Sequence, residues 1–166
     1  MNTAYRNMRH FWLYDTIADA KAQFPVLGEN QISIAGIEFC MYDGNNVIKN
    51  IFIACSTLKD ASMYFENNSP SGLGGFLGTP DKETLHPSLT DMLEAAAKIS
   101  HRMDIVKTLP PAKLFNTTFF AVSKKHLYAR QLSNDECMRK HAPFNRFFMS
   151  AQNMISAFRE ADEKIQ

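Results

Sequence analysis

The sequence predicts one α+β domain, in which an antiparallel sheet of four strands, or slightly more, packs against long amphipathic helices. Three observations support this fold class. Two segments rich in β-branched and aromatic residues each contain a turn, as β-hairpins do. Before, between and after these segments, apolar residues recur at the spacing of a helix face. The length of 166 residues is typical of one domain. We therefore expect residues 1–166 to form a single domain, with a flexible Gly/Pro-rich loop at about 67–87.

The most regular helical pattern lies near the C-terminal end of the sequence. It opens at Pro143, a residue well suited to a first helical turn. Its apolar residues follow the i, i+3, i+4, i+7 spacing of one helix face, and the stripe consists of Phe144, Phe147, Phe148, Ala151, Met154, Ile155 and Phe158. So many large apolar side chains on one stripe predict a helix that packs against the sheet.

Three further helices are predicted from shorter or less regular stripes. The first covers about 7–24, where a strand followed by a short helix is the alternative. The second covers 57–68, with a narrower apolar face. The third begins after Ser88, a residue type common at N-caps, and its stripe continues to Val106, before two consecutive prolines stop it.

Two hairpins are predicted between these helices. The first spans 32–55 and turns at 43–46, where Asp-Gly and Asn tolerate the positive φ of tight turns. The second spans 116–133 and turns at Lys124 and Lys125. Its predicted register pairs Val122 with Leu127 and Phe120 with Ala129.

The segment 69–88 contains four of the seven glycines and three of the seven prolines. Its glycine spacing, GxGGxxG, differs from that of phosphate-binding loops, and it follows a predicted helix rather than a strand. Its apolar residues Leu73, Phe76 and Leu77 either fold back onto the core or form a partner-binding loop.

Positive charge is concentrated between residues 107 and 146. This segment has eight Lys and Arg residues but only two Asp and Glu residues, although the whole chain has a net charge of +1. Within it we identify a candidate basic and aromatic patch on one hairpin: Lys124, Lys125, His126, Tyr128 and Arg130. Such a patch could stack bases and pair with phosphates, contact an anionic protein, or simply form a solvated edge.

No residue pattern indicates a catalytic or metal site. The cysteines Cys40, Cys55 and Cys137 form no CxxC pair, and no Cys/His spacing suits zinc. Scattered cysteines, together with the lack of a secretory signal pattern or an apolar run of about 20 residues, favour the cytoplasm and no membrane. We expect no cofactor and no metal.

Three functions remain open on this basis. The first is a small non-enzymatic protein that binds another protein or a second copy of itself; the nine methionines suit an adaptable binding surface. The alternative is a small-molecule-binding or enzymatic domain, with its pocket between the sheet and the 69–88 loop. Nucleic-acid binding through 124–146 ranks third, because the near-neutral composition argues against it.

Overall fold

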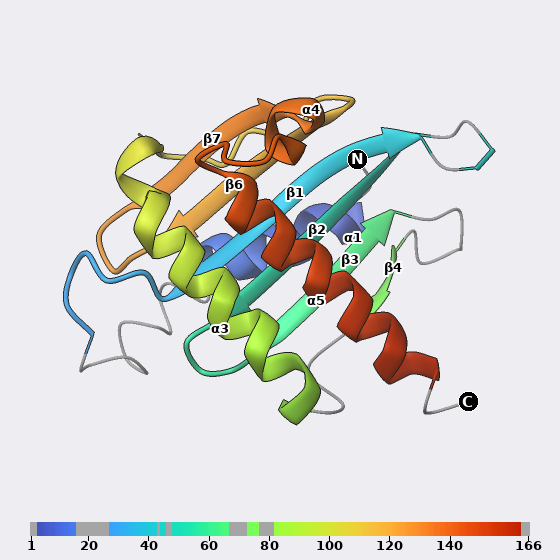
Figure 1. The fold of residues 1–166 in the computed structure, drawn as a ribbon, viewed down its shortest axis with the longest axis horizontal. Helices are drawn as coiled ribbons and strands as arrows, with labels where there is room; N and C mark the ends of the chain where they lie inside the picture. Colours follow the sequence, from blue (N-terminus) through green and yellow to red (C-terminus); the bar gives the residue numbers. More distant parts are fainter. Residues whose placement is uncertain are drawn as a thin grey trace.

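The computed structural model describes residues 3–15, 27–42, 44–45, 48–66, 73–76 and 82–163. These residues form three layers. A twisted antiparallel sheet lies in the middle, α3 (Lys82–Ile99) and α5 (Asn145–Glu163) lie side by side on one face, and α1 (Thr3–His10) lies behind the other (Figure 1). The predicted α+β class is therefore confirmed.

The sheet has seven strands, more than the four that the two predicted hairpins supply. Its order is β4-β3-β2-β1-β6-β7-β5, and all neighbouring pairs are antiparallel. The strands are β1 (Ile34–Tyr42), β2 (Ile48–Ser56), β3 (Ala61–Glu66), β4 (Leu73–Phe76), β5 (Asp104–Val106), β6 (Asn116–Val122) and β7 (Leu127–Ser133). The three additional strands, β3, β4 and β5, are short and lie toward the two edges.

Both predicted hairpins are present. β1 and β2 form the first, and β6 and β7 form the second. In the second hairpin Val122 pairs with Leu127 and Phe120 pairs with Ala129, so the predicted register is confirmed. The Ser123 hydroxyl closes the turn by accepting hydrogen bonds from the N–H groups of Lys125 and His126.

The predicted helix over 57–68 is wrong. Residues 61–66 form β3, which pairs with β2 after a turn in which Lys59 has a φ of 69°. The predicted stripe consists of Leu58, Ala61 and Phe65 and does not include Met63 or Tyr64. Both are buried, Met63 under the two long helices and Tyr64 on the α1 side. Burial on both faces requires the two-residue alternation of a strand.

The start and end of α3 also differ from the prediction. The helix begins at Lys82 rather than after Ser88, and Pro87 lies inside it. Leu85 is fully buried and extends the apolar stripe by one turn, which offsets the backbone hydrogen bond that Pro87 cannot make. The helix ends at Ile99, followed by a 3-10 turn, η2 (Ser100–Arg102), and β5, so the predicted stripe through Val106 is wrong at its end.

The segment predicted as one loop therefore contains structure. β4 pairs with β3, with Leu73 opposite Glu66 and Phe76 opposite Met63. The first turns of α3 occupy its C-terminal part. The remaining residues of that segment lie outside the described ranges.

The two ends of the chain agree better with the sequence. α1 is followed by a π-helical turn, η1 (Phe11–Asp15), so the predicted N-terminal helix is observed over 7–15 but starts four residues earlier; its continuation lies outside the described ranges. α5 begins two residues after Pro143, and all seven residues of its predicted stripe are buried. They form one core with α3 and the sheet, while α1 and η1 cover a second core on the opposite face.

A buried ion pair joins α1 to the centre of the sheet. Glu38, on β1, is fully buried, and its carboxylate lies 3.0 Å from the guanidinium of Arg9. It also accepts hydrogen bonds from the Tyr5 hydroxyl at 3.1 Å and the Ala112 N–H at 3.1 Å. Burial raises the pKa of Glu38 above its ordinary value, although Arg9, Ala112 and Tyr5 each act to lower it.

Candidate functional site

An apolar cavity of about 490 Å³ opens where the end of β1 meets β6, α4 (Asn134–Met138) and α5. We call it the methionine groove. Its lining is mostly apolar and consists of Phe39, Met41, Tyr42, Phe115, Thr117, Asn134, Met138, Phe148, Met149 and Gln152. Both its volume and its apolar character are typical of binding sites in proteins.

Large apolar side chains are unusually exposed at this groove. Met41 and Tyr42 are each 40% exposed, Met149 is 46% exposed, and Phe115 and Met138 are each 57% exposed. Five large apolar side chains that remain so accessible around one cavity form a contiguous apolar surface, and such surfaces mark interaction sites more often than scattered exposed residues do. Three of the five are methionines, whose flexible thioether chains adapt to differently shaped ligands.

Phe115 has a strained backbone that presents its ring at the groove. Its φ is 59°, in the left-handed region that a bulky residue rarely adopts. Its N–H donates to the Cys40 carbonyl, its own carbonyl accepts from the Asn134 N–H, and its ring contacts that of Tyr42 with centroids 5.7 Å apart. Strain of this kind costs about 1–3 kcal/mol and is concentrated at functional sites.

The short helix α4 is fixed at both ends. A capping box holds its start, in which the Ser133 hydroxyl accepts from the Glu136 N–H and the Glu136 carboxylate accepts from the Ser133 N–H. Asn134 accepts a hydrogen bond from the Thr117 hydroxyl, and Asn145 donates one to the Cys137 carbonyl. The wall that carries Met138 is therefore preorganised.

Replacing Ser133 by alanine tests this cap. We expect a loss of about 1 kcal/mol in the free energy of unfolding, measured by urea denaturation. The hydrogen bonds from Ser133 lower the pKa of Glu136, so the contribution of this carboxylate is present above its unfolded pKa and is lost as the pH falls through the folded value. The difference from wild type should therefore shrink in acid; an equal loss for Ser156→Ala, on the exposed face of α5, would contradict a role of the cap.

The residues predicted for a partner-binding loop are only partly described. Leu73 and Phe76 lie on β4, at one edge of the sheet, and their side chains lie outside the described part of the structure. Leu77 lies outside the described ranges altogether. Their role in binding stays a prediction.

The residues of the predicted basic and aromatic patch lie on the β6–β7 turn and along β7. Lys124 and Lys125 form the β6–β7 turn, and Lys125 lies 3.6 Å from the carboxylate of Glu29. The ring of His126 lies 5.8 Å from that of Tyr128, which is partly buried against the core under α3 and α5. Arg130 lies farther along β7, 3.5 Å from Asp104. Tyr128 and Arg130 are two residues apart on β7 and therefore share one face of that strand. Both ion pairs join largely exposed side chains and are weak, so binding at this patch stays a prediction.

The structure describes only part of the pocket predicted between the sheet and the 69–88 loop. β4, which belongs to that loop, lies at one edge of the sheet, and β7 lies beside the other edge. Residues 69–72 and 77–81 of the loop lie outside the described ranges, so this pocket stays a prediction.

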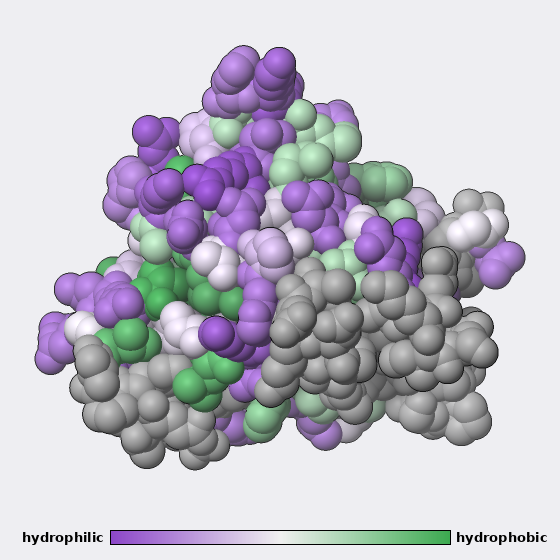
Figure 2. All heavy atoms as spheres, turned by 60° about the horizontal axis from the view of Figure 1, so that its bottom comes forward, coloured by the Kyte–Doolittle hydropathy of each residue, from purple (hydrophilic) through white to green (hydrophobic). Residues whose placement is uncertain are grey.

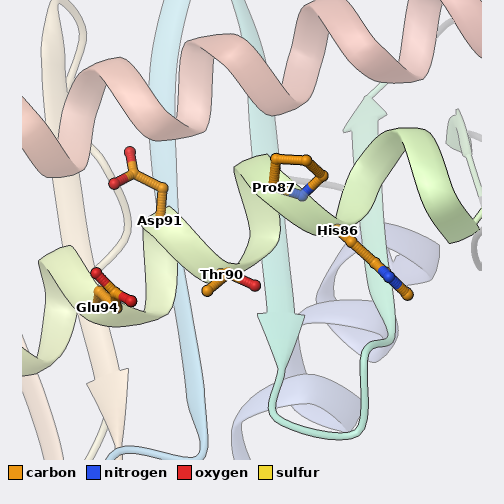
Figure 3. A pocket seen from close by; sticks show the side chains of 5 residues that line it. All are labelled: His86, Pro87, Thr90, Asp91 and Glu94. Atoms are coloured by element: carbon orange, nitrogen blue, oxygen red, sulfur yellow. The ribbon is translucent and has the colours of Figure 1, made fainter.

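The remaining candidates for chemistry are structural. Burial raises the pKa of all three cysteine thiols, to about 11 for Cys137, which opposes the reactive thiolate form. A hollow of about 420 Å³ lies over α3, but its Asp91, Glu94 and His86 side chains point in different directions (Figure 3). Arg146 bonds to both Asp91 and Glu94, so these carboxylates form an ion-pair network rather than an acid/base couple.

The described residues contain neither a candidate metal centre nor a candidate membrane-spanning helix. Within the described ranges, no group of three or more His, Cys, Asp and Glu side chains is placed to hold a metal ion, and no helix is long and apolar enough to cross a membrane. The face in Figure 2 shows a group of hydrophobic side chains among hydrophilic ones, and no described cavity is assigned to it.

Comparisons with known proteins do not identify a relative: no protein-family model, curated protein or solved structure matches the chain. Function is therefore inferred from the chain's own residues. Sequence reasoning missed the methionine groove because its lining comes from β1, the segment before β6, β6 itself, α4 and α5, which only the fold brings together. The one signal in the sequence was the abundance of methionine.

Proposed function

We propose that this protein binds another protein by accepting an apolar segment of that partner in the methionine groove. The observation that carries the proposal is the clustering of Met41, Tyr42, Phe115, Met138 and Met149, each at least 40% exposed, around one cavity. Covering these side chains would remove apolar surface from water, which stabilises a complex by roughly 25 cal/mol for each Å². The strained backbone of Phe115 supports a functional rather than an incidental role for this surface.

A protein partner fits the groove better than a small molecule. Small-molecule sites enclose most of the ligand and present a few convergent polar groups. Here five of the ten lining side chains are at least 40% exposed, and the polar side chains Thr117 and Asn134 bond to each other, which leaves Gln152 as the remaining amide of the lining. Helix-in-groove recognition needs only apolar contacts along an open depression.

The charges near the groove favour a partner helix with acidic flanks. Lys113 precedes Phe115 by two residues, and Arg139 and Lys140 directly follow Met138; all three cations are exposed. α4 has two acidic side chains, of which Glu136 is engaged in the capping box and Asp135 is exposed, so the three cations outnumber the acids. Complementary charge would orient such a partner and speed its association.

Photo-crosslinking in the native cell tests the proposal. A photoreactive amino acid replaces Met138 in one variant and Phe115 in another, and the matched control replaces Ile105, which is 61% exposed on the edge strand β5, outside the groove. We expect the two groove positions to capture the same protein and the control position not to capture it. The proposal would be contradicted if the groove positions still captured that protein in a chain that also carries Met149→Lys. It would also be contradicted if the Ile105 position captured that protein equally well.

Light scattering after gel filtration distinguishes a second copy from a different partner. Met149→Lys is expected to keep the wild-type melting temperature within roughly 2 °C, because changes at exposed side chains usually alter stability by less than about 0.5 kcal/mol. A wild-type dimer that this variant converts to a monomer would identify the partner as a second copy of the chain. If the wild-type chain is a monomer, the partner is a different protein, and crosslinking must then capture that protein.

A further inference from the structure

A second cavity, of about 370 Å³, lies on the other side of α4 and is lined by three arginines. We call it the arginine pocket: Arg102, Arg130, Leu132, Glu136, Arg139, Ala142, Pro143 and Phe144. Asn134 and Met138 of α4 contribute to the methionine groove, whereas Glu136 and the following Arg139 contribute to this pocket. The two sites share no lining residue.

Regular backbone structure places the three arginines. Arg102 ends the 3-10 turn η2, in which the Met103 N–H bonds to the Ser100 carbonyl at 3.0 Å, and Arg130 lies within β7. Arg139 is the C-cap of α4, and its carbonyl accepts a hydrogen bond from the Ala142 N–H at 3.0 Å. Three segments that are distant in the sequence thus bring guanidinium groups to one cavity.

The lining carries an excess of positive charge. Three guanidinium groups face one carboxylate, that of Glu136, which is already bonded to the N–H and hydroxyl of Ser133. Arg130 pairs with Asp104 at 3.5 Å, but both side chains are largely exposed, so this pair is weak. Among the described residues, no carboxylate lies within 4.0 Å of the side-chain nitrogens of Arg102 or Arg139.

The remaining walls are apolar. Leu132 is partly buried against the main core, Phe144 is buried, and Ala142 and Pro143 lie between α4 and α5. A ligand held by the arginines would therefore rest an uncharged part against aliphatic and aromatic carbon. The pocket combines an anion site with a short apolar wall.

We propose that the arginine pocket binds a phosphate monoester carried on a short apolar stem. The planar guanidinium group matches phosphate oxygens with two parallel hydrogen bonds, and the two surplus positive charges of the lining match the phosphate dianion. A phosphorylated side chain of a protein and a free small molecule share this chemistry. The proposal does not depend on the cavity of the methionine groove, because the two linings have no residue in common. Arg139, which lines the pocket, also follows Met138 directly and is one of the three cations near that groove.

Titration calorimetry with phenyl phosphate tests the pocket on the full-length chain. We expect binding that weakens with added salt, and inorganic phosphate and benzyl alcohol should each bind more weakly because each lacks one half of the ligand. Arg102→Gln with Arg139→Gln should weaken phenyl phosphate binding by at least about tenfold, since a hydrogen bond to a charged group contributes about that factor or more. Arg102→Lys should keep part of the affinity, because it keeps the charge but loses the planar fork.

Arg159→Gln is the matched control, because Arg159 is an exposed arginine of α5 that does not line the pocket. Thermal melting confirms that each variant is folded. The proposal is overturned if phenyl phosphate does not bind, if the control weakens binding as much as the pocket variants do, or if inorganic phosphate binds equally well. A phosphotyrosine peptide that binds more tightly than phenyl phosphate identifies the source as a protein, and weaker or equal binding identifies it as a small molecule.

Discussion

Replacing Glu38 by alanine is expected to lower the free energy of unfolding by about 3–5 kcal/mol, because it removes one partner of a buried ion pair. The change removes the carboxylate that accepts hydrogen bonds from the Tyr5 hydroxyl and the Ala112 N–H, and it removes the ion-pair partner of Arg9, whose guanidinium keeps the carbonyls of Leu109 and Pro110. In a domain of this size the expected fall in melting temperature is roughly 6–20 °C. Denaturant titration and thermal melting measure both quantities.

A double-mutant cycle separates the ion pair from the burial of Glu38. Because burial raises the pKa of Glu38, its charged form is costly, and an apolar pair should replace much of the interaction. Arg9→Met with Glu38→Leu should therefore cost less than the sum of the single changes, by about 1–3 kcal/mol.

Glu94→Ala makes the same chemical change at an exposed ion pair with Arg146 and should cost less than about 1 kcal/mol. Equal losses for Glu38→Ala and Glu94→Ala would show that the buried pair does not hold α1 to the sheet. The comparison matters because α1 and η1 provide the helical layer on that face of the sheet.

Local sequence patterns predicted the elements whose burial follows one simple period. The α5 stripe repeats at helical spacing, and the β6–β7 register follows from strong strand composition on both sides of a two-lysine turn. In both places the local pattern and the tertiary packing require the same conformation. When the local pattern and the tertiary packing favour the same conformation, the conformation of a segment can be predicted without knowing which other segments contact it.

The errors arose where tertiary contacts decide between two acceptable patterns. Residues 61–66 lie in a segment whose apolar residues fit a helical stripe. Their pairing with β2 and the burial of Tyr64 in the α1-side core select the strand instead. The apolar spacing predicts an α3 that is too long because Met103 continues it, whereas Met103 follows η2 in extended conformation and is buried there. The sequence of β4 predicts a loop because its glycines carry no strand signal.

The candidate sites were less predictable than the fold. The methionine groove and the arginine pocket each combine residues from separate segments, and neither contains a motif with fixed spacing. The charge excess over 107–146 did indicate the region that supplies most of the arginine pocket. It did not indicate that Arg102, from η2, would join Arg130 and Arg139 in one lining.

Gly36→Ala is expected to be the other strongly destabilising change, with a loss of about 3 kcal/mol. A Cβ atom at Gly36 would lie 2.1 Å from Cζ of Phe120 and 2.2 Å from the carbonyl oxygen of Ile53. Phe120 is fully buried and stacks on Phe52 with ring centroids 5.1 Å apart, so its ring cannot move without disturbing the α1-side core. Denaturant titration measures the loss.

Gly28→Ala is the matched control, because a Cβ there has no neighbour within 4 Å. Its free energy of unfolding should stay within about 1 kcal/mol of wild type.

Phe120→Leu in the Gly36→Ala background distinguishes the two obstacles. The smaller side chain relieves the contact with the ring, but the Ile53 carbonyl belongs to the backbone of β2 and can move only if β1 and β2 separate. We therefore expect the double variant to be less stable than Phe120→Leu alone. Equal stability of those two would mean that the ring is the sole obstacle, and a loss for Gly36→Ala no larger than that for Gly28→Ala would contradict the close packing of β1. Because β1 also carries Glu38 and ends at Met41 and Tyr42, a change in its spacing would reach both the α1 attachment and the methionine groove.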